Sequence, residues 1–395
     1  MSDQSLSPPF NQSPPLPVPL ATGLQKSHLP SLDGIRAVAV ALVVFYHLGI
    51  PGIPGGMGVL IFFVLSGFLI TWLLLKEEER FGHISLKLFY ARRTLRIFPA
   101  FYVYWFLIVG LWVVSSRHII WPQAISSFFY LDNYYQAIFG DPNTGLSHTW
   151  SLGVEEQFYI LWPLTFLLLK NNGRRIRFLL WSIAAVWLYR ELLIFVVHRS
   201  QGYIYEAFDT RADHLMIGCV LAVALRQRVW SRLWHLLVAS PSRMWLTVTG
   251  LVISAALSHS LHAIYRDSLA FIVDPILAAF LIVQGTAYSS SALGKSLNWG
   301  WVRYLGAISY SIYLYHPLAM GFGEKLFRKL PGLAPLAPLG AVIAVIAVAS
   351  ASYWLLEQPL QKLRARFSPR QSAPDLLPGA TKAVLTPSPG RPVVT

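Results

Sequence analysis

Long apolar runs separated by short polar connectors dominate the chain. A membrane-spanning helix needs about 17–25 predominantly apolar residues, and most of the runs are close to that length. We predict ten spans, over residues 36–50, 58–75, 97–116, 150–169, 177–198, 212–226, 243–258, 268–287, 302–320 and 337–356. The first run is short, so we expect it to extend into its flanks. The pattern therefore predicts an all-α fold, a polytopic transmembrane helix bundle of about ten spans.

Composition supports this prediction. The chain has 395 residues, of which 55% are hydrophobic and 13% are charged. A soluble protein carries roughly twice that charged fraction. Two Pro/Ser-rich tails, residues 1–29 and 368–395, flank a membrane domain over 30–367, and we expect both tails to be disordered. Because the first tail lacks the apolar core of a signal peptide, we expect the first span to direct insertion.

The positive charge follows the predicted topology. The net charge is +14, and the basic residues lie at the ends of the apolar runs. With the N-terminus inside, the inner connectors carry nineteen Lys and Arg and the outer connectors carry seven. This bias predicts that both termini are cytoplasmic, and it favours a membrane protein over a nucleic-acid binder. One outer connector, 117–149, is long and aromatic, and we expect it to lie along the membrane interface.

Two polar residues in the first span are the leading candidates for chemistry. Arg36 and His47 lie eleven residues apart, about 16 Å along a helix and on nearly the same face. Both side chains could therefore reach one groove. A histidine poised near neutral pH suits a general base, and an arginine suits a phosphate or an oxyanion. The structural alternatives are an interhelical hydrogen bond for His47 and an inside anchor for Arg36.

Two further stretches carry candidate residues, one inside the second span and one just before the third. Ser66 lies beside Gly67 in an apolar run, where small residues favour close helix packing, although its hydroxyl could contact a substrate. No strand-to-helix elbow surrounds it, so we exclude a serine-hydrolase nucleophile. Arg93 and Arg96 share a helical face before the third span. They suit either membrane anchoring or a polyphosphate such as coenzyme A.

The stretch from His148 to Pro163 opens the fourth span with two carboxylates. We expect Ser151 to be the N-cap and Glu155 and Glu156 to follow close to the first turn. Capping explains one glutamate. The other could orient or pair with His47, as an acid partner does for a catalytic base, and the sequence leaves open which of the two does so.

Other polar residues lie in or beside apolar runs. Arg211 and Asp213 could form an ion-pair cluster at the outer mouth or contact substrate, and His316 is a second histidine near the outer face. Trp150 opens the fourth span beside them. We assign Trp150, Arg211, Asp213 and His316 as candidate substrate-binding residues. No metal-ligand spacing or dinucleotide fingerprint occurs, so we expect no metal.

Six of these stretches together resemble the acyltransferase-3 family of integral membrane O-acyltransferases. They are LDGIRAVAVALVVFYH, FFVLSGFLI, RRTLRIFPAFY, HTWSLGVEEQFYILWP, TRADHLMIGC and ISYSIYLYHPL, in family order over about residues 30–360. The resemblance implies a bacterial inner-membrane enzyme with an acyl-CoA donor on the cytoplasmic side and a hydroxyl acceptor. It also implies that Arg36 and His47 are essential, that Arg93 and Arg96 help to hold the coenzyme, and that Glu155 or Glu156 is functional. Many relatives carry a hydrolase-like domain after the last span, whereas we expect no acyl relay to such a domain within this chain.

The hypothesis that follows is a membrane O-acyltransferase that moves an acyl group, in our expectation acetyl, from acyl-CoA to a carbohydrate or glycolipid hydroxyl. His47 would act as the general base or would carry the acyl group transiently. Arg36, Arg93, Arg96 and Ser66 would bind the donor. The rival function is a transporter or flippase of a lipid-linked sugar. No inverted repeat is evident, and an Arg–His pair on one helix favours catalysis.

Overall fold

The computed structural model describes residues 15–26, 29–116, 118–364 and 367, and helices are the regular structure throughout these residues. The longer helices are α2 (Pro30–His47), α3 (Gly55–Phe81), α4 (Leu86–Val114), α7 (Trp150–Leu168), α8 (Asn172–Phe195), α10 (Phe208–Arg226), α12 (Arg243–Ser260), α14 (Phe271–Ala287), α17 (Ser309–Lys329) and α18 (Ala337–Ser352). The shorter ones are α1 (Val18–Gln25), α5 (Trp121–Phe128), α6 (Asp132–Phe139), α9 (Gln201–Glu206), α11 (Ser231–Leu237), α13 (His262–Tyr265), α15 (Ala292–Leu297), α16 (Gly300–Ala307) and α19 (Gln358–Arg364). The all-α prediction is confirmed for the described part of the chain.

Each of the ten predicted spans falls on helical residues, and the ninth falls on two helices. Five helical stretches in the described residues are long and apolar enough to cross a membrane: Gly55–Phe81, Leu86–Val114, Asn172–Phe195, Arg266–Ala287 and Ala334–Leu363. Other helices carry more polar groups; α10, for example, contains Arg211 and Asp213. The ten-span topology and the cytoplasmic termini therefore remain predictions.

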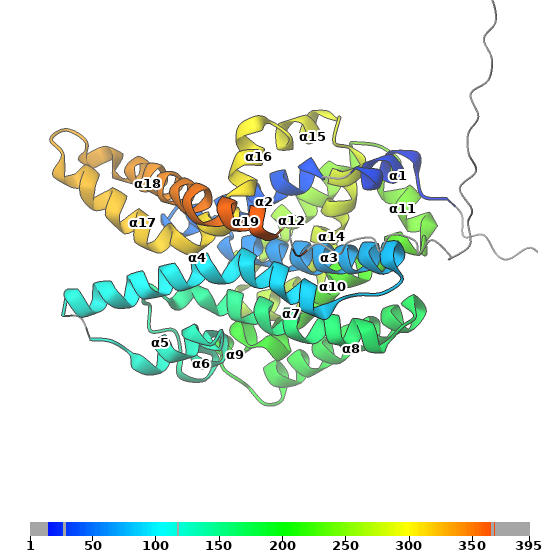
Figure 1. Cartoon of the computed structure of the whole chain (residues 1–395), viewed down its shortest axis with the longest axis horizontal. Coiled ribbons are helices and arrows are strands. Elements are labelled where there is room, and N and C mark those ends of the chain that lie inside the picture. The colour runs from blue at the N-terminus through cyan, green and yellow to red at the C-terminus, as the bar shows by residue number, and fades with distance from the viewer. Residues whose placement is uncertain (1–14, 27–28, 117, 365–366, 368–395) are drawn as a thin grey trace, which may run out of the picture.

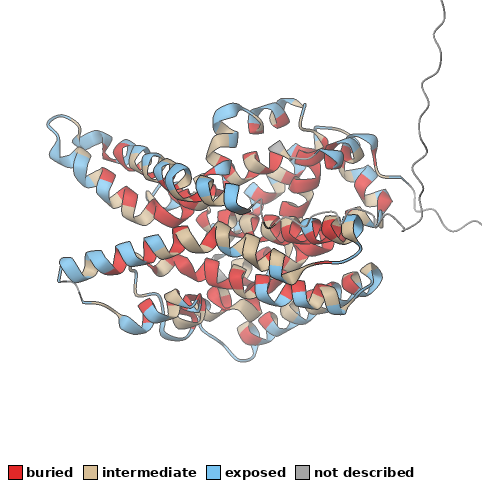
Figure 2. Cartoon of the chain, viewed as in Figure 1, coloured by how far each residue is buried: buried red, intermediate tan, exposed pale blue. Residues whose placement is uncertain are grey.

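Helix α3 is the most buried of these five stretches and lies at the centre of the molecule (Figures 1 and 2). It packs against α2 on one side and α10 on the other. The contact with α10 depends on glycine, because a Cβ on Gly67 would come within 1.9 Å of the Leu215 carbonyl oxygen and one on Gly218 within 2.1 Å of the Val64 oxygen. The helix-packing interpretation of Gly67 is confirmed.

The C-terminal end of α3 is held by three consecutive carboxylates. Glu77 pairs with Arg92 of α4 at 2.6 Å, and Glu78 pairs with Arg175 of α8 at 2.7 Å. Glu79 pairs with Arg226 of α10. The helix ends at Phe81, and the next residue, Gly82, has a φ of 71°, which favours glycine. One helix end thus joins three neighbours.

Two predicted elements differ in the structure. The ninth span is two helices, α16 and α17, which separate at Ile308. α16 packs on α2 whereas α17 packs along α18 (Figure 1). The break at Ile308 lets the predicted ninth span pack against both of these helices. Part of the first predicted tail forms α1, because Leu20 and Leu24 are buried and the helix packs against α14.

In the described part of the long connector, residues 118–149, two short helices form, α5 and α6. Their polar side chains face inward: Gln123, Ser127, Asp132, Asn133 and Gln136 are buried. Their exposed side chains are large and apolar, including Trp121, Ile125, Phe129, Ile138 and Phe139. This inverted pattern suits an apolar environment outside the protein, and placement of the connector at the membrane interface stays a prediction.

Candidate active site

Two cavities lie toward opposite ends of α3. The first, the arginine cavity, has a volume of about 330 Å³ and is lined by α3 from Val59 to Glu77, by α4, and by Arg36. The second, the histidine cavity, has a volume of about 790 Å³ and is lined by the α2–α3 loop, by His47, by α9 and by the connector between α6 and α7. Val59 and Tyr313 line both cavities. The two spaces therefore adjoin at these side chains.

The arginine cavity brings together most of the predicted donor-binding residues. Its polar lining includes Arg36, Ser66, Arg92, Arg93 and Arg96. The Arg36 Nε donates to the Ser309 hydroxyl at 3.1 Å, a contact made possible by the helix break at Ile308.

Two of these groups, Arg93 and Ser66, contact Tyr159. The Arg93 guanidinium lies 3.4 Å from the centre of the Tyr159 ring, and the Arg93 Nε has no hydrogen-bond partner. The Ser66 hydroxyl is hydrogen-bonded to the Tyr159 hydroxyl. Several guanidiniums converging on a cavity suit a polyanionic ligand, since each presents a planar fork to phosphate oxygens.

The two glutamates of α7 face different ways. Glu155 lines the arginine cavity, whereas Glu156 is buried outside it, 4.0 Å from the Arg93 Nε. His47 lines the other cavity, so the expected pairing of an α7 glutamate with His47 does not appear in this arrangement. The expected Ser151 N-cap is also wrong, because the helix begins at Trp150 and the Ser151 hydroxyl bonds instead to the Tyr313 hydroxyl at 2.5 Å.

Three histidines gather at the end of α2. The His47 and His316 ring centres are 4.7 Å apart, and those of His316 and His148 are 5.3 Å apart. The His47 Nδ1 lies 2.8 Å from the Val43 carbonyl oxygen. Because a carbonyl only accepts, Nδ1 must carry the proton, which leaves the Nε2 lone pair of His47 free to act as a base.

His148 is a residue that the sequence analysis did not single out. Its Nε2 donates to the Leu314 carbonyl at 3.0 Å, so its Nδ1 carries the lone pair, and that atom has no partner in the protein. Burial and the neighbouring His47 lower the pKa of His148 to about 3, which keeps the ring neutral. By the same reasoning His316 donates its Nδ1–H to the Tyr313 carbonyl at 2.7 Å.

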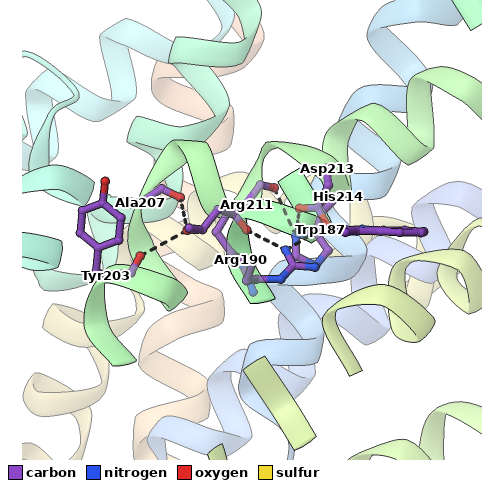
Figure 3. Close-up of polar contacts among 8 residues, drawn as sticks. Trp187, Arg190, Tyr203, Ala207, Arg211, Asp213 and His214 are labelled. Atoms are coloured by element: carbon purple, nitrogen blue, oxygen red, sulfur yellow. Dashed lines mark hydrogen bonds and ion pairs between the residues drawn. The ribbon is translucent and has the colours of Figure 1, made fainter. Parts of the chain in front are cut away.

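The side chain of Asp213 contacts other protein side chains in a buried cluster. Its Oδ2 accepts from the Arg190 Nη1 at 3.0 Å and from the Trp187 Nε1 at 2.9 Å, and the His214 Nδ1 lies 3.4 Å from Oδ1 (Figure 3). Arg190 also donates to the Thr210 carbonyl at 2.8 Å. Asp213 and Arg190 are fully buried and line neither cavity. The cluster ties α8 to α10.

Arg211 lies in the wall between the cavities. It is fully buried, and its guanidinium is enclosed by the rings of Phe63, Trp150, Tyr205 and Phe271 at 4.0–5.9 Å. Phe63 lines the arginine cavity and the other three rings line the histidine cavity. Cation–π attraction offsets part of the cost of burying this charge. Of the four predicted substrate-binding residues, only Trp150 lines the histidine cavity itself.

Comparison with known proteins decides the family. A family model described as an acyltransferase domain matches residues 29–357. The chain belongs to this acyltransferase family.

Two relatives of the acyltransferase show how far the similarity extends. The peptidoglycan O-acetyltransferase OatA of Listeria monocytogenes is 34% identical over 322 residues, which cover 75% of this chain and 50% of OatA. The protein YrhL of Bacillus subtilis is 35% identical over 316 residues, covering 73% of this chain and 48% of YrhL. The acyltransferase thus spans about half the length of these two relatives. No solved structure matches it.

Proposed function

We propose that this acyltransferase is a multi-pass inner-membrane enzyme that moves an acyl group, in particular acetyl, from acyl-CoA to a hydroxyl of a carbohydrate or glycolipid. The observation that carries the proposal is the pair of adjoining cavities with opposite chemistry. One has arginines suited to a polyphosphate donor, and the other is larger and has a histidine base among polar and apolar side chains. The Listeria relative is named for O-acetylation of peptidoglycan, which supports acetyl as the group and a glycan as the acceptor.

The donor enters the arginine cavity. Arg36, Arg92, Arg93 and Arg96 bind the phosphates of coenzyme A. The apolar side chains of α3 contact the rest of the coenzyme A molecule as it extends toward Val59. Under the predicted topology the mouth of this cavity, near Glu77 and Arg92, faces the cytoplasm. Ser66 and Glu155 line the same cavity and contact the donor there.

Transfer takes place where the cavities adjoin. The His47 Nε2 accepts the proton of the acceptor hydroxyl, and the hydroxyl oxygen attacks the thioester carbonyl carbon. The carbon–sulfur bond then breaks, and the coenzyme A thiolate takes up the proton that His47 holds. In the alternative course, His47 Nε2 attacks the thioester carbonyl carbon first and the carbon–sulfur bond breaks, which releases the coenzyme A thiolate. The acceptor hydroxyl then attacks the acyl-imidazole, the bond to Nε2 breaks, and the hydroxyl proton goes to the thiolate. The Val43 carbonyl fixes the tautomer that both courses require.

The proposal is tested with purified protein in liposomes, radiolabelled acetyl-CoA and glycan strands from peptidoglycan. Wild-type protein should transfer label to the glycan, and His47→Ala should reduce the rate about 10³-fold, within the range for loss of a general base. His83→Ala is the matched control, because His83 is exposed, lines neither cavity and bonds only locally, to the Phe81 carbonyl. A folded His47→Ala protein with wild-type turnover would contradict the assignment.

A further inference from the structure

Three buried side chains of the histidine cavity hold polar atoms that have no hydrogen-bond partner in the protein. These atoms are His148 Nδ1, Glu206 Oε2 and Asp274 Oδ1. The three residues are 8%, 9% and 6% exposed, and all three line the histidine cavity. A buried polar atom without a hydrogen-bond partner is destabilising. Three around one cavity suggest that a ligand supplies the missing partners.

These residues come from distant parts of the chain. His148 lies in the turn before α7, Glu206 ends α9, and Asp274 lies in the first turn of α14. A π-helical turn, Arg266–Ala270, precedes α14 and packs against α9. Such turns occur often at functional sites because they rotate the side chains of the following helix.

Aromatic rings complete the lining of this part of the cavity. Trp150 and Tyr205 both face the cavity, and their ring centres are 5.2 Å apart. The Tyr205 ring lies between two guanidiniums, with Arg211 at 4.9 Å and Arg266 at 5.4 Å. These contacts hold the ring in place. Flat apolar surfaces beside a few oriented polar atoms form a pocket suited to a sugar, which presents both C–H faces and hydroxyl groups.

We propose that His148, Glu206 and Asp274 form the acceptor subsite, which binds a pyranose ring through its hydroxyl or amide N–H groups. This inference rests on the proposed acyl transfer and names the residues that recognise the acceptor. Hydroxyl groups suit the site because His148 Nδ1 can only accept a hydrogen bond, while a carboxyl group accepts or donates according to its protonation. In this arrangement the residues that line the cavity pack against a second layer of side chains, which contains Arg211, Asp213 and His316.

Isosteric variants test the subsite without changing side-chain volume. Glu206→Gln and Asp274→Asn should each raise the KM for peptidoglycan glycan strands about tenfold, which corresponds to loss of one hydrogen bond, and the KM for acetyl-CoA should stay unchanged. The matched control is Glu191→Gln. Its Oε1 also lacks a partner, but Glu191 lines neither cavity, so the KM for the glycan should not change.

The outcomes separate the subsite from the proposed function. If wild-type protein acetylates the glycan and both variants keep its KM, water rather than sugar satisfies these atoms and the subsite is wrong, while acyl transfer stands. If wild-type protein acetylates no glycan, the proposed function fails and the subsite fails with it. Melting temperatures show whether each variant folds. Should Glu206→Gln fail to fold, Glu206→Asp withdraws the carboxyl by one methylene and is expected to raise the KM for the glycan in the same way.

Discussion

The arginine cavity and the histidine cavity adjoin at two side chains, yet their chemistry is different. The arginine cavity is the smaller, and its charged lining is mainly guanidinium. The histidine cavity is more than twice as large and contains histidines, carboxylates, amides and aromatic rings. A compact set of cations selects a polyanion by charge, whereas scattered acceptors and rings select a polyhydroxylated molecule by shape and hydrogen bonding.

This difference explains why the chain separates Arg36 from His47. Both lie on α2, but Arg36 faces the donor cavity and His47 faces the acceptor cavity. One helix therefore contributes a group to each substrate. The reacting atoms must meet near Val59 and Tyr313, because these residues belong to both cavities.

Blocking the junction of the two cavities should have the largest effect on turnover. Val59→Trp places an indole where the cavities adjoin and should lower kcat about 100-fold, since small displacements of reacting groups cost that much. The dissociation constants for acetyl-CoA and glycan should change little, as measured by binding to the purified variant. Val103→Trp on the exposed face of α4 is the control. Unchanged turnover in a folded Val59→Trp protein would show that the substrates meet elsewhere.

A change confined to the arginine cavity should affect one substrate only. Arg93→Gln removes a guanidinium that stacks on Tyr159 and should raise the KM for acetyl-CoA about 10- to 100-fold, the range for a hydrogen bond to a charged group. The KM for the glycan should stay the same. Arg174→Gln, at an exposed position outside both cavities, serves as the control in the same steady-state assay. An equal rise in both KM values would contradict the division between the cavities.

The smallest predicted effect concerns pH and stability. Burial, with the nearby Asp141 and Asp132 carboxylates, raises the pKa of Glu206 to about 8. The folded protein therefore binds a proton that the unfolded chain releases near its ordinary pKa of 4.5. Stability should fall as the pH rises through this window, and the loss should be complete above about pH 8.

Glu206→Gln removes this proton linkage. The variant should melt about 5 °C higher than wild type at pH 8.5, and the two should melt alike at pH 4. Part of the pH dependence should persist in the variant, because burial also raises the pKa of Asp132 to about 7. The other charged residues on the elements that contact α9 are Glu155, Glu156, Arg174, Arg175, Arg177, Arg190, Glu191, Asp209, Arg211, Asp213, Arg226, Arg266 and Asp267. Equal differences in melting temperature at both pH values would contradict the linkage.

The sequence predicted the helices well because apolar runs report burial or lipid contact directly. It also singled out the arginine-cavity residues, since charges beside apolar runs are conspicuous. It missed Glu206 and His148, which lie in polar connectors where such residues are ordinary. It assigned Asp213 to substrate because a charge in a span attracts attention, whereas Oδ2 of that carboxylate accepts hydrogen bonds from Arg190 and Trp187. Tertiary pairing of this kind leaves no local pattern.

The measurement that tests the central claim most directly is the sidedness of transfer. Protein would be oriented in sealed vesicles, with the end that carries Glu77 and Arg92 facing the bath and the glycan acceptor enclosed. Radiolabelled acetyl-CoA, which does not cross the bilayer, would be added to the bath. The account predicts label on the enclosed glycan and none on glycan added outside. Label that appears only when donor and acceptor share one side would contradict two cavities that open toward opposite ends of α3.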